Sequence, residues 1–200
     1  MALDISAFRG VKDLVIAKYA DGGTYGEVTP LAGVQNIGFD VSESVAVHYF
    51  DNKAAIVISS EGEDTLSLTV SKTDLKTRAL IEGRAYDETK KALIGTPKKT
   101  SDSFALGFKA QLTNGDQEWY WFYFGKFTTG SKEFATQDDG TDISTMSYTF
   151  TAAFTPETFT VDGKAQPVKY ALIEVSDETA APAATYFDAV TTPDKILATA

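Results

Sequence analysis

Side chains that could carry catalytic chemistry are scarce in this sequence. His48 is the only histidine, and there is no cysteine. A histidine-based triad, a multi-histidine metal site and a thiolate nucleophile or metal site therefore cannot be built. His48 lies in an alternating pattern typical of a strand, where a packed or surface histidine is the simpler interpretation. We expect no enzyme activity, no metal and no cofactor.

Three short motifs could still suggest chemistry, and each has a simpler structural interpretation. Residues 138–142 place carboxylates close together, but they lack the ligand spacing and the closing glutamate of an EF-hand loop. Glu61 and Glu63 could form an acid–base pair, but they lie in an acidic turn without an apolar pocket. Residues 22–26 are rich in glycine, but they do not join a strand to a helix as a phosphate-binding loop does. We interpret all three as solvated turns.

The stretch around which the rest of the chain is organised is aromatic. Residues 118–127 hold both tryptophans, and aromatic side chains favour a pleated strand. Asn114-Gly115 precedes this stretch and is a strong signal for a two-residue hairpin turn. Residues 104–112 alternate between apolar and small or polar side chains, which predicts the partner strand. A two-residue turn would place Phe108 opposite Trp121.

This register divides the side chains of the hairpin between two faces. The expected core face consists of Phe104, Leu106, Phe108, Ala110, Leu112, Trp119, Trp121 and Tyr123. The other face carries Tyr120, Phe122 and Phe124, so it also has to be covered, by a helix or by a neighbouring subunit. The candidate core or interface aromatics are Trp119, Tyr120, Trp121, Phe122 and Phe124. Stacking on a sugar is an alternative use of these rings, although packing is the commoner explanation for aromatics in the middle of a strand.

The remaining sequence is mostly a series of short strands. Alternating or apolar runs predict strands at residues 11–20, 31–41, 45–50, 54–59, 66–70, 146–154, 159–161 and 168–175. The period changes at Ser71, where a capping-box pattern predicts one short helix over about residues 72–82, with Gly83 as its stop. We therefore expect a mainly β protein, an antiparallel β-sandwich or barrel with one flanking α-helix.

Long loops and terminal arms complete the predicted architecture. Residues 87–102 and 128–141 are expected to be loops, and both are long for a compact domain. The chain is expected to form one β-domain over residues 1–175, with an N-terminal arm at 1–9. Residues 176–200 are rich in Ala, Thr and Pro and predict a C-terminal arm or extension, with a helical turn near 182–190.

Composition limits the classes of partner. A hydrophobic fraction of 43% with 23% charged residues is typical of a folded soluble protein. The net charge is -10, and most of the excess of Asp and Glu over Lys and Arg lies after residue 100. The chain is therefore not expected to bind the phosphates of nucleic acid. No apolar run approaches membrane-spanning length, and the first residues do not form a secretory signal. We expect synthesis in the cytosol and no membrane partner.

Several patterns, taken in order, resemble the major tail proteins of long-tailed, non-contractile bacteriophages. The resemblance covers roughly residues 8–155. The patterns that carry it are Gly10–Lys18, Tyr25-Gly26, Pro30–Val34, Tyr49–Asn52, Leu66–Val70, Leu75–Gly83, Phe104–Phe108, Asn114-Gly115 and Trp119–Phe127. The resemblance implies a β-sandwich or barrel that forms hexameric rings, and these rings stack into a tail tube. It also implies a virion protein made in the bacterial cytoplasm, with no catalytic residues.

In such tubes the partners are further copies of the chain, the tape-measure protein and other tail proteins, while DNA passes through an acidic lumen without specific binding. The candidate lumen residues here are Asp116, Glu118, Glu133, Asp138, Asp139 and Asp142. Residues 42–53 and the N-terminal residues 1–9 are the candidates for contact between successive rings. The alternative function is a monomeric β-sandwich module that binds a carbohydrate or a cell-surface ligand.

Overall fold

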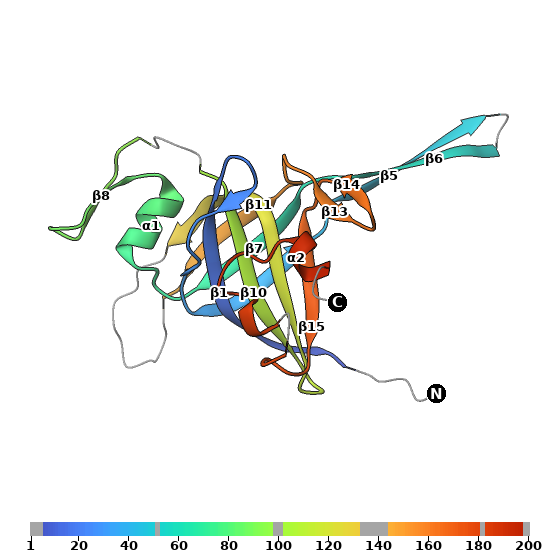
Figure 1. Cartoon of the computed structure of the whole chain (residues 1–200). Coiled ribbons are helices and arrows are strands. Elements are labelled where there is room, and N and C mark those ends of the chain that lie inside the picture. The colour runs from blue at the N-terminus through green and yellow to red at the C-terminus, as the bar shows by residue number, and fades with distance from the viewer. Residues whose placement is uncertain (1–5, 51–52, 98–101, 133–143, 181–182, 198–200) are drawn as a thin grey trace.

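The computed structural model describes residues 6–50, 53–97, 102–132, 144–180 and 183–197 (Figure 1). The protein is mainly β, with antiparallel pairing throughout the described sheets. The strands are β1 (Phe8–Ala20), β2 (Thr24–Tyr25), β3 (Thr29–Pro30), β4 (Val34–Asp40), β5 (Glu43–Phe50), β6 (Lys53–Glu61), β7 (Asp64–Val70), β8 (Ala85–Asp87), β9 (Ala92–Ile94), β10 (Phe104–Leu112), β11 (Gln117–Lys132), β12 (Met146–Ala152), β13 (Phe159–Val161), β14 (Lys164–Gln166) and β15 (Tyr170–Val175). The helices are α1 (Leu75–Glu82), the 3-10 helix η1 (Ala183–Thr185) and α2 (Pro193–Leu197). The predicted fold class is confirmed.

One nine-stranded sheet forms the body, in the order β2-β1-β10-β11-β12-β7-β4, with β15 added beside β11 and β3 beside β1. The long strand β11 joins the two halves of this sheet. Its first part lies between β10 and β15, and from Gly125 onward it pairs with β12. A side chain at Gly125 would place its Cβ 2.5 Å from the carbonyl oxygen of Thr151. The position where β11 begins to pair with β12 therefore requires glycine.

The sheet encloses one core and carries a second core on its other face. The first core consists of side chains from β1, β7, β10, β11 and β12, together with Ile81 of α1. The second core contains both tryptophans and Tyr123, and it is covered by Ala183, Tyr186 and Val190 of the C-terminal segment. The described part of the predicted C-terminal arm therefore packs against the sheet. The face for which we expected a helix or a neighbouring subunit as cover carries Tyr120 and Phe122, and these residues lie in the first core, which includes Ile81 of α1.

The predicted hairpin of β10 and β11 exists, but its predicted register is wrong. The N–H of Leu112 donates to the carbonyl of Asp116 over 2.9 Å, so the loop holds three residues instead of two. Gly115 in this loop has a φ of 101°, which a glycine adopts without strain. Phe108 consequently lies opposite Tyr120, and Trp121 lies opposite Gly107.

This shift of one residue exchanges the expected faces, because side chains alternate along a strand. Tyr120 and Phe122 share a core with Leu106 and Phe108, whereas the two tryptophans lie on the opposite face. The small Gly107 leaves room there, since an added Cβ would lie 2.9 Å from the Trp121 ring and 2.8 Å from Phe187.

Helix α1 begins later than the capping-box pattern predicts. Its N-cap is Asp74, whose carboxylate accepts a 2.9 Å hydrogen bond from the backbone N–H of Thr77. The hydroxyl of Ser71 instead accepts from the backbone N–H of Gly33. The predicted stop is confirmed, because Gly83 caps the C-terminal end with a φ of 61°.

Helix α1 is fastened to the sheet through Glu82. The Glu82 carboxylate binds Arg78 at 2.8 Å, Lys132 of β11 at 3.0 Å and Arg84 at 3.1 Å. Burial alone would raise the pKa of Glu82, but the hydrogen bonds from Arg78 and Lys132 outweigh it and lower this pKa. The carboxylate therefore remains ionised at neutral pH.

Two predicted loops and one arm also contain regular structure. The predicted loop 87–102 contains β9 and the last residue of β8, which together form a short hairpin. Strand β11 extends to Lys132 into the predicted loop 128–141. Phe8 and Arg9, which we assigned to the N-terminal arm, are the first residues of β1, and the Ala7 backbone bonds to Thr113. Residues 51–52, between the predicted strands 45–50 and 54–59, lie outside the described residues.

Candidate assembly surface

Strands β5 and β6 form a hairpin that leaves the body of the protein. They pair with each other in a separate two-stranded sheet, and in the part of the chain that the structure describes neither strand pairs with the nine-stranded sheet. Figure 1 shows this hairpin extending away from the body, on the side opposite α1 and β8. It corresponds to the predicted strands 45–50 and 54–59, whose adjacent positions in the sequence allow a short connection.

Apolar side chains are exposed on both faces of this hairpin. Val47 and Val57 lie directly opposite each other on one face, with 40% and 65% of their surfaces exposed. Ile58 lies on the other face, opposite Ala46, and is 51% exposed. An isolated two-stranded hairpin is only marginally stable in water. A hairpin with apolar groups on both faces therefore has the properties of an element that is covered by a partner.

The base of the hairpin is held by the buried side chain of Lys169. Its Nζ lies 2.8 Å from Glu61 Oε1, 2.9 Å from the Gly62 carbonyl and 3.0 Å from Asp64 Oδ1. The Lys169 side chain is 2% exposed, and Asp64 is fully buried. Burial by itself would lower the pKa of Lys169, but the hydrogen bonds and charges of Glu61 and Asp64 raise it. Lys169 is therefore an ammonium ion at this position.

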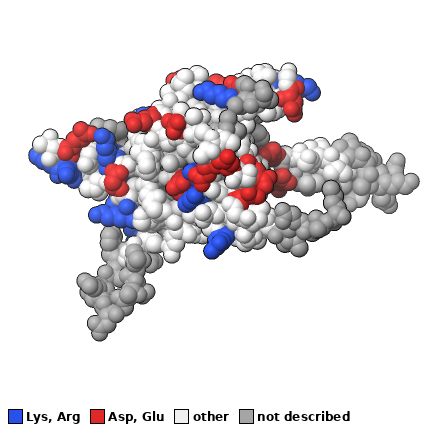
Figure 2. Space-filling model, turned by 60° about the horizontal axis from the view of Figure 1, so that its bottom comes forward, with Lys and Arg blue, Asp and Glu red and all other residues white. Residues whose placement is uncertain are grey.

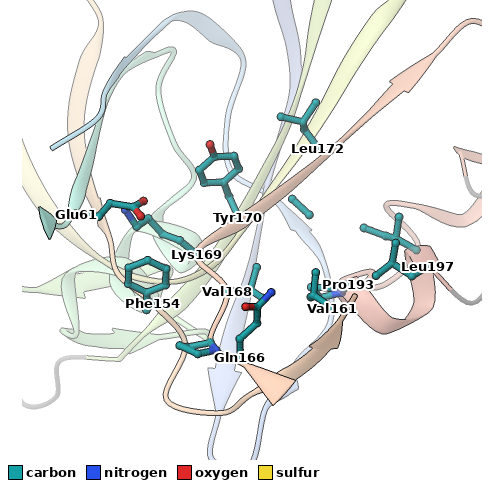
Figure 3. Close-up of a pocket in the computed structure, with 13 residues that line it drawn as sticks. Glu61, Phe154, Val161, Gln166, Val168, Lys169, Tyr170, Leu172, Pro193 and Leu197 are labelled. Carbon is teal, nitrogen blue, oxygen red and sulfur yellow. The ribbon is translucent and has the colours of Figure 1, made fainter. Parts of the chain in front are cut away.

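A groove of about 450 Å³ lies beside this base. Figure 3 shows Lys169, Glu61 and Phe154 on one side of the groove and Pro193 and Leu197 on the other. The lining is mainly apolar and includes residues at the start of β15. Among the described residues, β15 pairs only with β11, so its other edge remains open beside the groove.

The structure describes only two of the six candidate lumen residues. Asp116 and Glu118 lie half-buried at the turn and first residues of β11, while Glu133, Asp138, Asp139 and Asp142 lie outside the described residues. Glu118 lies directly opposite Glu174 of β15, so two carboxylates share one face of neighbouring strands. Like charges in this position reduce stability. Figure 2 shows acidic side chains gathered near the middle of the face that comes forward when the molecule is tilted.

The candidate aromatic residues are packed inside the protein. Trp119 is 3% exposed, and Trp121 and Phe122 are fully buried, while Tyr120 and Phe124 are half-buried. The indole N–H of Trp121 donates to the carbonyl of Tyr186 over 3.0 Å. Neither tryptophan can serve as an exposed stacking platform for a sugar.

The other motifs with potential chemistry do not converge. His48 lies exposed on the hairpin, Glu61 binds Lys169, and Gly22 and Gly23 occupy a turn with positive φ. Within residues that the structure describes, no three His, Cys, Asp or Glu side chains are placed to hold a metal ion. In the same parts of the chain, no helix is long and apolar enough to cross a membrane.

Sequence reasoning missed the two main features of this surface. Apolar residues at both alternating positions, such as Val45 and Val47 with Ala46, were a signal that both faces of one hairpin are apolar. The ionic contact of Lys169 joins residues that are more than a hundred positions apart in sequence, and no local pattern predicts it. Comparison of the sequence with models of protein families and with curated proteins finds no match.

Proposed function

We propose that this chain is a self-assembling structural subunit, the tail-tube protein of a long-tailed, non-contractile bacteriophage. The proposed assembly consists of hexameric rings stacked into a tube that conducts DNA, with the tape-measure protein and other tail proteins as partners. The protein would act in the virion, have no catalytic role and bind DNA without specificity. The observation that carries the proposal is the projecting β5–β6 hairpin, with apolar side chains exposed on both faces.

The position of the hairpin favours assembly between unlike surfaces. A projecting element that docks onto a different surface of the next copy makes a heterologous contact, and such contacts generate rings or filaments. The body supports this arrangement, because both of its cores are covered by the chain itself. The hairpin and the groove beside its base then carry most of the large apolar side chains that remain exposed, while Phe8 and Ile94 lie elsewhere.

Charge is consistent with a conduit for DNA. The net charge of -10 disfavours binding to phosphate, and the opposed Glu118 and Glu174 place two carboxylates on one sheet face. A lumen with this character would repel DNA and allow it to slide. The resemblance in the sequence supplies the ring symmetry and the virion context of the proposal.

Negative-stain electron microscopy across a concentration series tests the proposal. We expect wild-type protein to form hollow tubes or rings of uniform width. The double variant Val47→Lys/Val57→Asp should keep its melting temperature within a few degrees but fail to assemble, because a charged pair that still matches across the strands replaces the apolar pair. Ile94→Asp is the matched control, since Ile94 is 55% exposed on β9, away from the hairpin, and this variant should assemble normally.

Two results would contradict the proposal. Normal tubes from the double variant would show that the hairpin is not the contact. Wild-type protein that stays monomeric at every concentration and binds a glycan in a screen would favour the monomeric binding module.

A further inference from the structure

We propose that Lys169 is a positioning residue that fixes the direction in which the β5–β6 hairpin leaves the body. Only the consequence for assembly rests on the proposed function. The positioning role itself is a property of the isolated chain and can be measured on it.

The contacts of Lys169 join both ends of the hairpin. Its ammonium binds Glu61, the last residue of β6, Gly62 in the turn that follows, and Asp64, the first residue of β7. The other end is tied to the same point, because the backbone N–H of Ser42 donates to Asp64 Oδ1 over 3.3 Å. The carbonyl of Ser42 accepts from the N–H of Gly62 over 2.7 Å. The two ends are therefore held together and against the residue preceding β15.

Every N–H donor of the Lys169 ammonium has a hydrogen-bond acceptor. A lysine has three N–H donors, and Lys169 has three acceptors within 3.0 Å. The ring of Phe154 lies 4.8 Å from its Nζ and adds a cation–π contact. A lysine stem is normally flexible, but here four contacts fix its end at one point.

Gly62 lies close to Ser42 at the base of the hairpin. A Cβ at Gly62 would lie 2.7 Å from the Ser42 hydroxyl oxygen. A larger residue at position 62 would therefore require the Ser42 side chain to move. This packing restricts hinge motion at the same place where the ion pairs act.

The physical case for a positioning role follows from the energetics of buried ions. A buried ion pair adds little net stability compared with a well-packed apolar pair, because both charges lose their hydration. What it does add is directional, since hydrogen bonds to a charged group require defined geometry. The hairpin continues β4 and β7 of the main sheet, but its ladder is separated from theirs by the short connections at residues 41–42 and 62–63. The Lys169 contacts restrain the chain at this break between the two ladders, where the hairpin could otherwise bend.

The absence of cysteine allows a direct measurement of hairpin direction. Spin labels are placed on Val47→Cys in the hairpin and on Lys126→Cys, an exposed site of β11 in the body. Pulsed electron paramagnetic resonance at monomeric concentration then gives the distribution of distances between them. We expect one narrow peak for the otherwise wild-type chain.

The test variant is Lys169→Met/Asp64→Leu, which removes both fully buried charges together and avoids leaving one unpaired. We expect its distance distribution to broaden at least twofold while the thermal transition remains cooperative. The matched control is Lys132→Met, which removes a lysine–glutamate pair at α1 and should leave the narrow peak unchanged. If the double variant does not fold, Glu61→Gln replaces it, because the Glu61 side chain is 48% exposed and its loss should be tolerated.

A narrow, unshifted peak in a folded test variant would overturn the positioning role. Broadening of the same size in Lys132→Met would also overturn it, because the effect would then be general loosening. These outcomes are independent of assembly. Suppose that the distance peak is narrow in the wild-type chain and broad in the test variant, and that the wild-type chain does not form tubes. The positioning role then stands, and the proposed function fails.

Discussion

Substitution of Trp121 tests whether the C-terminal segment is the true cover of the second core. The ring is fully buried against Phe187, with centroids 5.3 Å apart, and against Gly107. Trp121→Ala should therefore cost about 3–5 kcal/mol of unfolding free energy. The carbonyl of Tyr186 loses the indole N–H but keeps the hydroxyl of Thr191 at 3.0 Å. Trp121→Phe should cost only about 1–2 kcal/mol, since no buried acceptor is left unpaired.

Urea unfolding followed by circular dichroism and by the fluorescence of Trp119 measures both costs. With an m value of about 2–3 kcal/mol per M for a chain of this size, Trp121→Ala should lower the midpoint by roughly 1–2 M. Leu172→Ala is the control, because Leu172 is 44% exposed and its loss should change stability by about 0.5 kcal/mol or less. A cost below about 1 kcal/mol for Trp121→Ala would refute the buried position of the ring and revive the binding-module alternative.

Three further predictions concern single side chains. Asp74→Ala removes the N-cap of α1 and should cost about 1 kcal/mol, measured by urea unfolding; an unchanged midpoint would contradict the cap. Folding lowers the pKa of Glu82. Ionised Glu82 therefore stabilises the fold fully at pH values above its pKa in the unfolded chain, and this stabilisation is lost as the pH falls through its pKa in the folded protein. Thermal melts should therefore show wild-type stability declining below about pH 4, and Glu82→Gln should be less stable at neutral pH but less sensitive in that window. Glu174→Lys should gain about 0.2–1 kcal/mol by pairing with Glu118 across the strands, whereas in an assembled tube the same change should slow the release of DNA; a loss of stability would contradict the opposed geometry.

The parts of the fold that the sequence predicts are those set by local pattern. Alternation over residues 146–152 predicts β12, and Gly83 predicts the end of α1, because strand periodicity and helix caps act within a few residues. The hairpin of β10 and β11 was predicted for the same reason. Its register was wrong because a three-residue loop and a two-residue loop fit the same Asn114-Gly115 signal, and only packing on both faces decides between them.

The parts that could not be predicted depend on contacts between distant segments. Tyr186 lies in a segment rich in Ala and Thr, and nothing local indicates that it covers Trp121. Lys169 looks like an ordinary surface lysine beside a strand, and its burial becomes evident only when β15 and the base of the hairpin meet. The candidate lumen residues were chosen by charge alone, so sequence could not say which of them share a face. Glu174, which lies opposite Glu118, was not among them.

The covered second core changes where an assembly contact has to be sought. If the face with Trp119 and Trp121 were exposed in the free chain, a partner would have to bury this aromatic surface for the chain to be stable. Folding would then depend on association. With Tyr186 and Val190 over that face, both body cores are complete within one chain. A large share of the exposed apolar surface is on a hairpin that the main sheet does not need for its own pairing. Loss of the Val47 and Val57 side chains should therefore separate assembly from folding, and this separability follows from which element covers the tryptophans.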